Sequence, residues 1–177
     1  MSKVFVTADL HLGHNAICRY RTQFSTPEEH TELVLDNYKS IITKRDTVYF
    51  MGDIAFSDEA ADRLDELPGY KILILGNHDT DRGREKAKYL MSKFDRVYGS
   101  LSKKGCWWSH IPIHPDELRG KYCVHGHVHN NTIQDPRYAN VCLENTNYYP
   151  VDFQEVKARL TAGEIFTKNT KGTPNGQ

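Results

Sequence analysis

Short apolar runs alternate with longer segments of helical periodicity along the first half of the chain. The runs Val4–Val6, Val48–Met51 and Ile72–Leu75 have the length and the aromatic and β-branched content of buried strands. Between them, apolar residues recur at helical spacing from Pro27 to about Lys44 and from Asp58 to Leu67. This β-α-β-α-β order predicts a sheet whose first strands are parallel.

The expected helix ends carry local signals. Thr26 is followed by a proline and two glutamates, which is the pattern of a capped helix with proline at its first position. Ser57 stands in the same way before the second helix, and Pro68-Gly69 ends that helix. His30 lies inside the first helix, where we expect a surface position.

The second half of the chain predicts a mixed sheet. A third helix is expected over about Arg84 to Phe94. The strand-like segments Val97–Leu101 and Cys106–Ser109 flank Lys103-Lys104-Gly105 in the manner of a hairpin. An antiparallel pair would therefore join the parallel strands.

The chain predicts one domain and a tail. Tyr138–Leu143 is typical of a further strand, and Asp152 stands at the capping position of a last short helix through Leu160. A length of 177 residues corresponds to about one domain. We expect this domain over residues 1–161, and residues 162–177 form a polar segment without periodicity that we expect to be mobile.

Composition narrows the classes of partner. The 23 Lys and Arg residues balance 23 Asp and Glu residues, so the basic surface expected for binding long nucleic acid is missing. The four cysteines show no CxxC spacing, which favours reduced thiols and a cytoplasmic protein. No signal peptide precedes the first strand, and no apolar run approaches the roughly 20 residues of a membrane span. A small substrate and no membrane partner are expected.

Polar clusters follow five of the strand-like runs. The clusters are Asp9-Leu10-His11, Gly52-Asp53, Gly76-Asn77-His78-Asp79, Ser109-His110 and Gly126-His127-Val128-His129. In α/β sheets, ligands bind outside the carboxyl ends of the strands. The five clusters are therefore expected to converge on one crevice.

The residue types in these clusters favour a metal site. Residues two apart in a strand point to the same side, so Asp9 and His11 can address one ion, as can His127 and His129. Four imidazoles, two carboxylates and one amide oxygen without thiolates favour Mn, Fe, Zn, Ni or Co. This set is too large for one ion but fits two metals about 3.5 to 4 Å apart that share a carboxylate.

The five motifs, in this order, resemble those of the calcineurin-like metallophosphoesterase superfamily. They extend over about the first 130 residues. The segments Ala8–His14 and Thr146-Asn147-Tyr148-x-Pro150 also resemble the small bacterial and phage members. The resemblance implies an α/β fold in which mixed β-sheet layers form a β-sandwich flanked by helices, with the active site at the C-terminal ends of strands.

The resemblance also implies a division of metal ligands. The first metal would be held by Asp9, His11, Asp53 and His129, and the second by Asp53, Asn77, His110 and His127. Asp53 would bridge two divalent ions, with Mn preferred over Fe, Zn, Ni and Co. A hydroxide between the ions would attack phosphorus in line with the leaving oxygen. For the lone histidine we prefer His110 to His114, four positions away.

Two further residues are implied to be catalytic. His78 would stand beside the leaving group, where it would stabilise the transition state or donate a proton. Asp79 would hold the His78 imidazole in the useful tautomer.

Five other residues are candidates for substrate binding. His14 and Asn15 follow the first motif closely, with loop solvation as the alternative. Arg19 and Arg21 have the chemistry to hold a second phosphate, although arginines in a polar loop are often only solvated. Tyr148 would stack on a nucleobase or simply pack.

These features predict a dinuclear metal-dependent phosphoesterase, with a phosphodiester of small or nucleotide type as the preferred substrate. A phosphomonoesterase acting on nucleotides, metabolites or phosphoproteins would use the same ligands. A non-catalytic metal-binding scaffold is disfavoured because His78 and all seven ligands are present. A nuclease is disfavoured by the length and neutral charge. The sequence leaves the oligomeric state open.

Overall fold

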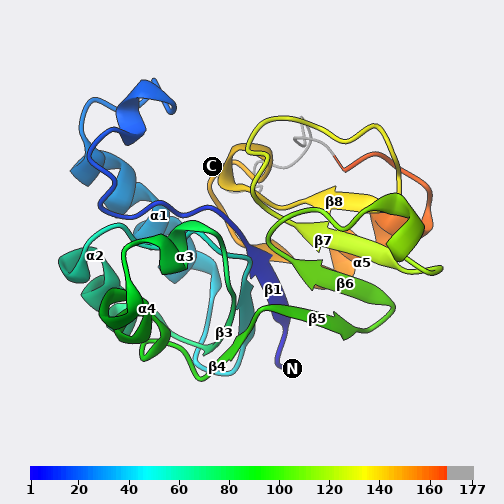
Figure 1. Cartoon of the computed structure of the whole chain (residues 1–177), viewed down its shortest axis with the longest axis horizontal. Helices are drawn as coiled ribbons and strands as arrows, with labels where there is room; N and C mark the ends of the chain where they lie inside the picture. Colours follow the sequence, from blue (N-terminus) through cyan, green and yellow to red (C-terminus); the bar gives the residue numbers. More distant parts are fainter. Residues whose placement is uncertain (167–177) are drawn as a thin grey trace.

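Two mixed β-sheets face each other, and helices cover the outer face of the larger sheet (Figure 1). The structure is a computed structural model and describes residues 1–166. The larger sheet has the strand order β4-β3-β2-β1-β9 and the smaller one β5-β6-β7-β8. The expected α/β fold with mixed, sandwiched sheets is confirmed.

The strands of the larger sheet are β1 (Val4–Thr7), β2 (Thr47–Phe50), β3 (Tyr70–Ile74), β4 (Arg96–Tyr98) and β9 (Val151–Asp152). Those of the smaller sheet are β5 (Ser100–Lys103), β6 (Cys106–Ser109), β7 (Tyr122–His125) and β8 (Tyr138–Asn140). The α-helices are α1 (Pro27–Ile41), α2 (Asp58–Asp62), α3 (His78–Asp81), α4 (Arg84–Met91) and α5 (Phe153–Thr161). Short 3-10 turns are η1 (Ile17–Arg19), η2 (Arg63–Glu66), η3 (Pro115–Glu117) and η4 (Leu143–Asn145).

Strands β1 to β3 are parallel, as the β-α-β-α-β order predicts, and β4 pairs in parallel with β3. Their side chains alternate between two cores because successive residues of a strand point to opposite faces. Phe5, Phe50 and Leu73 lie in the core under the helices. Val6 and Ile74 lie in the core between the sheets. The sheet is therefore buried on both faces, and its strand ends are free to carry polar groups.

The expected helix starts are present. The Thr26 hydroxyl accepts a hydrogen bond from the Glu29 N–H, and the Ser57 hydroxyl accepts one from the Ala60 N–H, each 3.1 Å long. His30 is an exception to the sequence reading, because its side chain is fully buried rather than at the surface.

The expected hairpin is only partly right. Strands β5 and β6 are antiparallel and joined through Lys104-Gly105, but Val97 belongs to β4 in the other sheet. The chain passes from one sheet to the other at Gly99, so one strand-like run supplies two strands. The strand predicted over Tyr138–Leu143 ends at Asn140 and continues as a turn.

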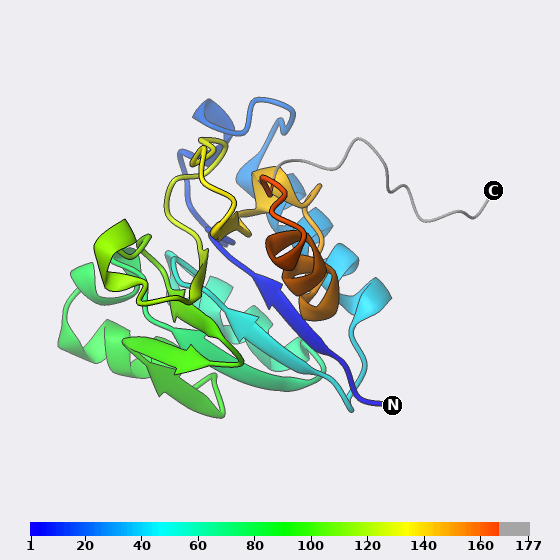
Figure 2. The same cartoon turned by 90° about the vertical axis from the view of Figure 1, so that its right-hand side faces the viewer.

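Helix α5 closes the space between the sheets and lies beside β1 (Figure 2). The Asp152 carboxylate caps it by accepting from the Gln154 N–H at 2.9 Å. Beyond the helix, Phe166 is only 4% exposed and packs into the core between the sheets. The domain therefore extends past the expected boundary at residue 161, and the rest of the predicted tail, residues 167–177, lies outside the described residues.

Within residues 1–166, none of the helices has the length and hydropathy required to cross a membrane. Cys106, Cys123 and Cys142 are buried free thiols, and Cys18 is partly exposed.

Replacing Phe166 with alanine tests whether this segment is part of the core. We expect the free energy of unfolding to fall by about 3 kcal/mol, as for other buried phenylalanines. Urea unfolding measures this change. Ile111→Ala is the control, because Ile111 is more than half exposed. Equal stability of the two variants would show that Phe166 contributes nothing to the core.

Candidate metal centre

The loops that follow β1 and β2 run side by side beyond the sheet. The Asp9 N–H donates to the Gly52 carbonyl and the His11 N–H to the Asp53 carbonyl, both at 3.0 Å. The Leu12 N–H extends this ladder by donating to the Ile54 carbonyl at 2.9 Å. These bonds hold the first two motifs together.

Several of the expected metal ligands share a left-handed backbone conformation. Their φ angles are 57° at Asp9, 51° at His11, 56° at Asp53, 71° at His127 and 51° at His129. A residue other than glycine held in a sparsely populated region costs on the order of 1–3 kcal/mol. Such residues cluster at functional sites, where the surrounding structure fixes them.

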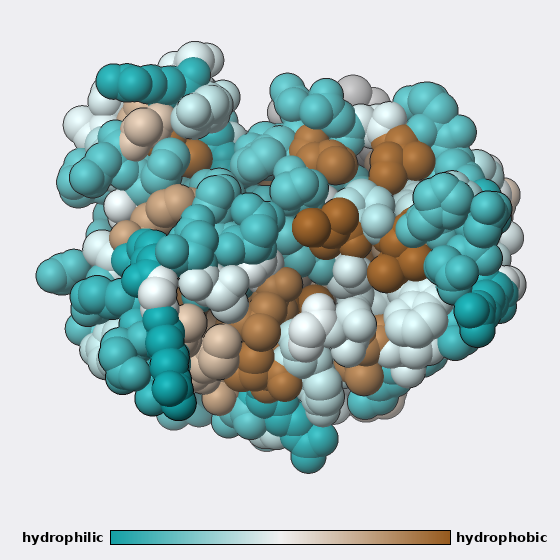
Figure 3. All heavy atoms as spheres, in the orientation of Figure 1, coloured by the Kyte–Doolittle hydropathy of each residue, from teal (hydrophilic) through white to brown (hydrophobic). Residues whose placement is uncertain are grey.

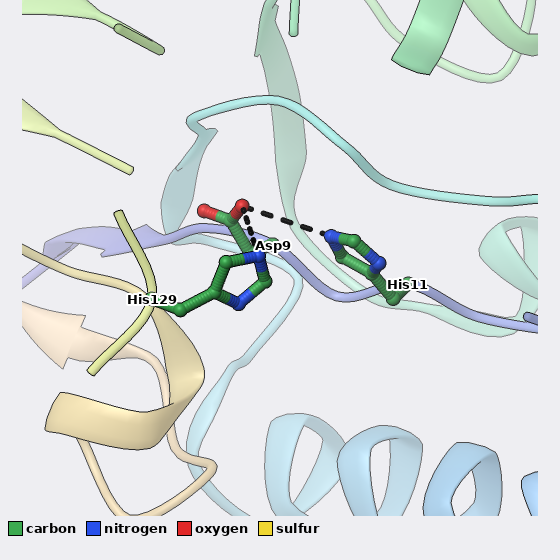
Figure 4. Close-up of side chains that lie close together, drawn as sticks. All are labelled: Asp9, His11 and His129. Atoms are coloured by element: carbon green, nitrogen blue, oxygen red, sulfur yellow. Dashed lines mark ion pairs between the residues drawn. The ribbon is translucent and has the colours of Figure 1, made fainter. Parts of the chain in front are cut away.

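The first group of candidate ligands consists of Asp9, His11 and His129 (Figure 4). Oδ1 of Asp9 lies 3.7 Å from Nε2 of His11 and 3.9 Å from Nε2 of His129. Within the described part of the chain, Oδ1 of Asp9 and Nε2 of His11 are buried and have no hydrogen-bond partner. Buried polar atoms without partners are costly, and a cation between them would satisfy both.

The other oxygen of Asp9 is fully engaged. Its Oδ2 accepts from the His127 N–H at 2.9 Å and from the Cys142 thiol at 3.1 Å. Burial alone would raise the pKa of Asp9, but the His11 contact and the charge of His110 outweigh it and lower the pKa. Asp9 is thus held as a carboxylate with one oxygen directed at the histidines.

The second group consists of Asp53, His110 and His127, with Asn77 beside them. Nε2 of His110 lies 3.3 Å from Oδ2 of Asp53, 3.2 Å from Nδ1 of His127 and 3.1 Å from Oδ1 of Asn77. His114, the alternative to His110, lies on an exposed turn.

Asp53 lies between the two groups. Its Oδ2 is 3.3 Å from Nε2 of His110 in the second group and 3.9 Å from Nε2 of His11 in the first. Its Oδ1 accepts from the His78 N–H at 2.9 Å. One oxygen is thus fixed by the backbone, while the other faces histidines of both groups.

The contacts of His110 fix the orientation of its ring and raise its pKa. Its Nδ1 donates to the Met51 carbonyl at 2.7 Å, which directs Nε2 toward the carboxylates. Burial would lower the pKa of His110, but its contact with Asp53 and the charges of Asp9 and Asp53 raise it to about 9. The two carboxylates therefore favour a positive charge at this position.

Two motif glycines allow the carboxylates to approach the backbone. A Cβ at Gly126 would lie 2.3 Å from Oδ2 of Asp9, and one at Gly76 would lie 2.2 Å from Oδ1 of Asp53. Neither distance is sterically possible for a carbon and an oxygen that are not bonded. The glycines in the third and fifth motifs are therefore needed to position the two carboxylates.

The expected role of Asp79 is wrong. Its buried carboxylate accepts from the N–H groups of Asp53 at 3.1 Å, Ile54 at 2.9 Å and Gly76 at 2.7 Å. The His78 imidazole instead bonds to Asp81 through Nδ1 at 2.6 Å. Asp79 therefore joins the loops after β2 and β3.

A cavity of about 860 Å³ adjoins the two groups of candidate ligands. Its walls include His14, Arg19, Tyr20 and Phe56, and His78 lies at its edge together with His127 and His129. The space-filling view shows a notch in the surface beside the segment that carries η1 (Figure 3). The centre is thus open to a ligand from one side.

The proposed substrate-binding residues are divided by the structure. His14 and Arg19 line the main cavity, and Tyr148 lines a neighbouring one of about 350 Å³. Asn15 lines a separate cavity of about 220 Å³ near α1 and α2. Arg21 borders both of the larger cavities, but it is almost fully buried and its Nε is bonded to Glu144 at 2.9 Å, which argues against the phosphate contact.

Three supporting residues carry no signal in the sequence pattern. Asp81, Cys142 and Glu144 contact His78, Asp9 and His129, respectively. Glu144 and Cys142 lie outside the five motifs, and their contacts span 15 and 133 positions of the chain. Only the folded arrangement reveals these pairs.

The fold and the five ordered motifs place the chain in a known class of protein. It belongs to the calcineurin-like phosphoesterase family, whose model matches residues 2–163. This confirms the resemblance on which the ligand assignment was based.

The relatives are small phage and archaeal proteins. The gene 66 protein of Mycobacterium phage D29 is 31% identical over 81% of this chain and 89% of its own length. The uncharacterized protein MJ1445 of Methanocaldococcus jannaschii is 26% identical over 93% of this chain and 95% of its own. The crystal structure of AQ665 from Aquifex aeolicus, a protein of unknown function, matches with a TM-score of 0.70 and 26% identity over 89% of this chain and 99% of its own.

Gly126→Ala tests the close approach at Asp9. The added Cβ must displace the Asp9 carboxylate, so we expect at least a tenfold loss of Mn²⁺ affinity in calorimetric titration. Gly99→Ala is the matched control, because nothing lies within 4 Å of its added Cβ. Unchanged affinity in Gly126→Ala would contradict the need for this contact.

Proposed function

We propose that this protein hydrolyses phosphate esters with two divalent cations bound at the two ligand groups. The observation that carries the proposal is the position of Asp53, whose Oδ2 faces histidines of both groups. The proposed ligands are Asp9, His11, Asp53 and His129 for one cation and Asp53, Asn77, His110 and His127 for the other.

The donor set fits this pair of cations. It contains imidazole nitrogens and carboxylate and amide oxygens, which suit Mn, Fe, Zn, Ni or Co, and we propose Mn. Two such cations would lower the pKa of a water molecule and neutralise the phosphoryl oxygens as they gain charge. The buried carboxylates and the left-handed loops fix the ligand geometry in advance, which is the protein's share of this chemistry.

His78 is the proposed leaving-group residue. Its side chain is 41% exposed at the edge of the cavity, and its ring centroid lies 6.1 Å from that of His11. Because Nδ1 is bonded to Asp81, Nε2 is the atom left to serve the leaving oxygen. The backbone N–H of His78 also donates to Oδ1 of Asp53. His78 would therefore contact both the proposed bridging carboxylate and the leaving group of the substrate.

We propose a phosphodiester with a small or nucleotide-like alcohol group as the substrate. The cavity offers aromatic walls from Tyr20 and Phe56, and among residues 1–166 no ion pair engages Arg19, unlike Arg21. A phosphomonoester would engage the same ligands but would place two negative charges at the cations.

The experiment that tests the proposal is a pair of hydrolysis assays with metal-stripped protein. Bis-p-nitrophenyl phosphate and p-nitrophenyl phosphate are compared before and after addition of Mn²⁺. Metal-dependent release of nitrophenol supports the phosphoesterase, and the faster substrate identifies the ester class. Absence of turnover on both esters with Mn²⁺ bound would count against the proposed activity.

Asp53→Asn tests the proposed bridge. Loss of the charge shared by both groups is expected to remove most bound metal and most activity together, although the amide keeps the side chain's size. Metal analysis after gel filtration measures the stoichiometry. Retention of two ions per chain would contradict the bridging role.

His78→Ala separates catalysis from metal binding. We expect the turnover number on the diester to fall by about 10² or more, as for loss of a general acid, with Mn²⁺ stoichiometry unchanged. His114→Ala is the matched control, since His114 is exposed and belongs to neither ligand group of the described structure. A turnover number equal to that of the control would remove His78 from the mechanism.

A further inference from the structure

Arg21 is a buried arginine at the back of the first ligand group. Its side chain is almost fully buried, and its Nη2 donates to the Asp9 carbonyl at 2.6 Å while Nη1 donates to the Leu10 carbonyl at 3.3 Å. The same Nη1 lies 2.7 Å from Nε2 of His30. Burial and the arginine charge lower the pKa of His30 to about 3, so its ring is neutral and Nε2 accepts the hydrogen bond. The guanidinium thus joins the loop after β1 to helix α1.

The third nitrogen of the Arg21 guanidinium, Nε, leads to the third residue of the group. Its Nε bonds to Oε1 of Glu144 at 2.9 Å, and the same oxygen accepts from Nδ1 of His129 at 2.9 Å. Glu144 forms an ion pair with the buried guanidinium of Arg21, so the group is held as a carboxylate. A carboxylate on Nδ1 fixes the ring orientation and leaves Nε2 directed at Asp9.

The backbone of His129 is held from the same side. Its carbonyl accepts from the side-chain amides of Asn140 and Asn145, both at 2.7 Å. These bonds support the left-handed conformation at His129. Ring and backbone of this ligand are therefore both fixed by the segment that includes Glu144.

We propose that Arg21 and Glu144 are positioning residues that align the first ligand group for its cation. One guanidinium contacts the loop of Asp9 and His11 directly and reaches His129 through Glu144. The second ligand group is held differently, by the Met51 carbonyl on His110 and the His78 N–H on Asp53. The pair therefore acts on one of the two cation sites. This inference rests on the proposed dinuclear centre.

The test is a calorimetric titration of metal-stripped protein with Mn²⁺. In Glu144→Ala we expect one of two binding steps to weaken 10- to 100-fold, the loss typical for removal of a hydrogen-bond partner from a metal-ligating histidine. The other step should stay within about twofold. Glu32→Ala is the matched control, because Glu32 forms an exposed ion pair with Arg63 outside the centre.

Two further variants distinguish positioning from a general structural role. Arg21→Met should weaken the same step, and the double variant should lose little more than the worse single variant, because the two residues act through one another. Glu144→Gln keeps the size of the side chain and guards against misfolding of the alanine variant; we expect it to weaken the same step by at least threefold.

Three results would overturn the inference. Both Mn²⁺ steps could weaken equally, or neither step could change in folded Glu144 variants, or the effects of the two single variants could add fully. Failure of the proposed function has a different signature, namely two Mn²⁺ ions bound by the unaltered chain without hydrolysis of either ester.

Discussion

Two buried carboxylates determine how the loops of this protein are arranged. Asp9 and Asp53 each use one oxygen to accept a backbone N–H from a distant motif, His127 in one case and His78 in the other. Their second oxygens face histidines. Burying a charge is tolerated only when it is paired and hydrogen-bonded, so the loops after β1, β2, β3 and β7 must meet in one register. The close approach at Gly76 and Gly126 follows from this requirement.

The same arrangement places several features that lower the stability of the fold at one end of the molecule. Left-handed residues, carboxylates in a buried setting and ring nitrogens without partners lie within a few loops of the described chain. A ligand that binds only the folded state offsets such costs by mass action. The hydrophobic core does not share this dependence, because its clusters are built from apolar side chains that need no ligand. The apolar residues that stabilise the fold are therefore different from the polar loop residues that form the site.

The sequence predicted the features that local pattern determines. Apolar runs and capping residues located the parallel strands and helices α1 and α2, and the ordered motifs located the residues that form the two candidate metal-binding groups. The errors come from side-chain contacts that only the folded loops define. His30 is buried because Arg21 needs an acceptor, and Arg21 is engaged because Glu144 lies beside it after folding. Asp79 and Asp81 are two positions apart, and only the loop geometry shows which one contacts His78.

The ligand groups each draw on both sheets of the sandwich. Asp9 and His11 follow β1 of the larger sheet and His129 follows β7 of the smaller one, while Asp53 follows β2 and His110 and His127 follow β6 and β7. A cation in either group would therefore fasten one sheet to the other at the ends of their strands. Separation of the two sheets at this end would then require a coordination bond to break, so this end of the sandwich would become the last to open.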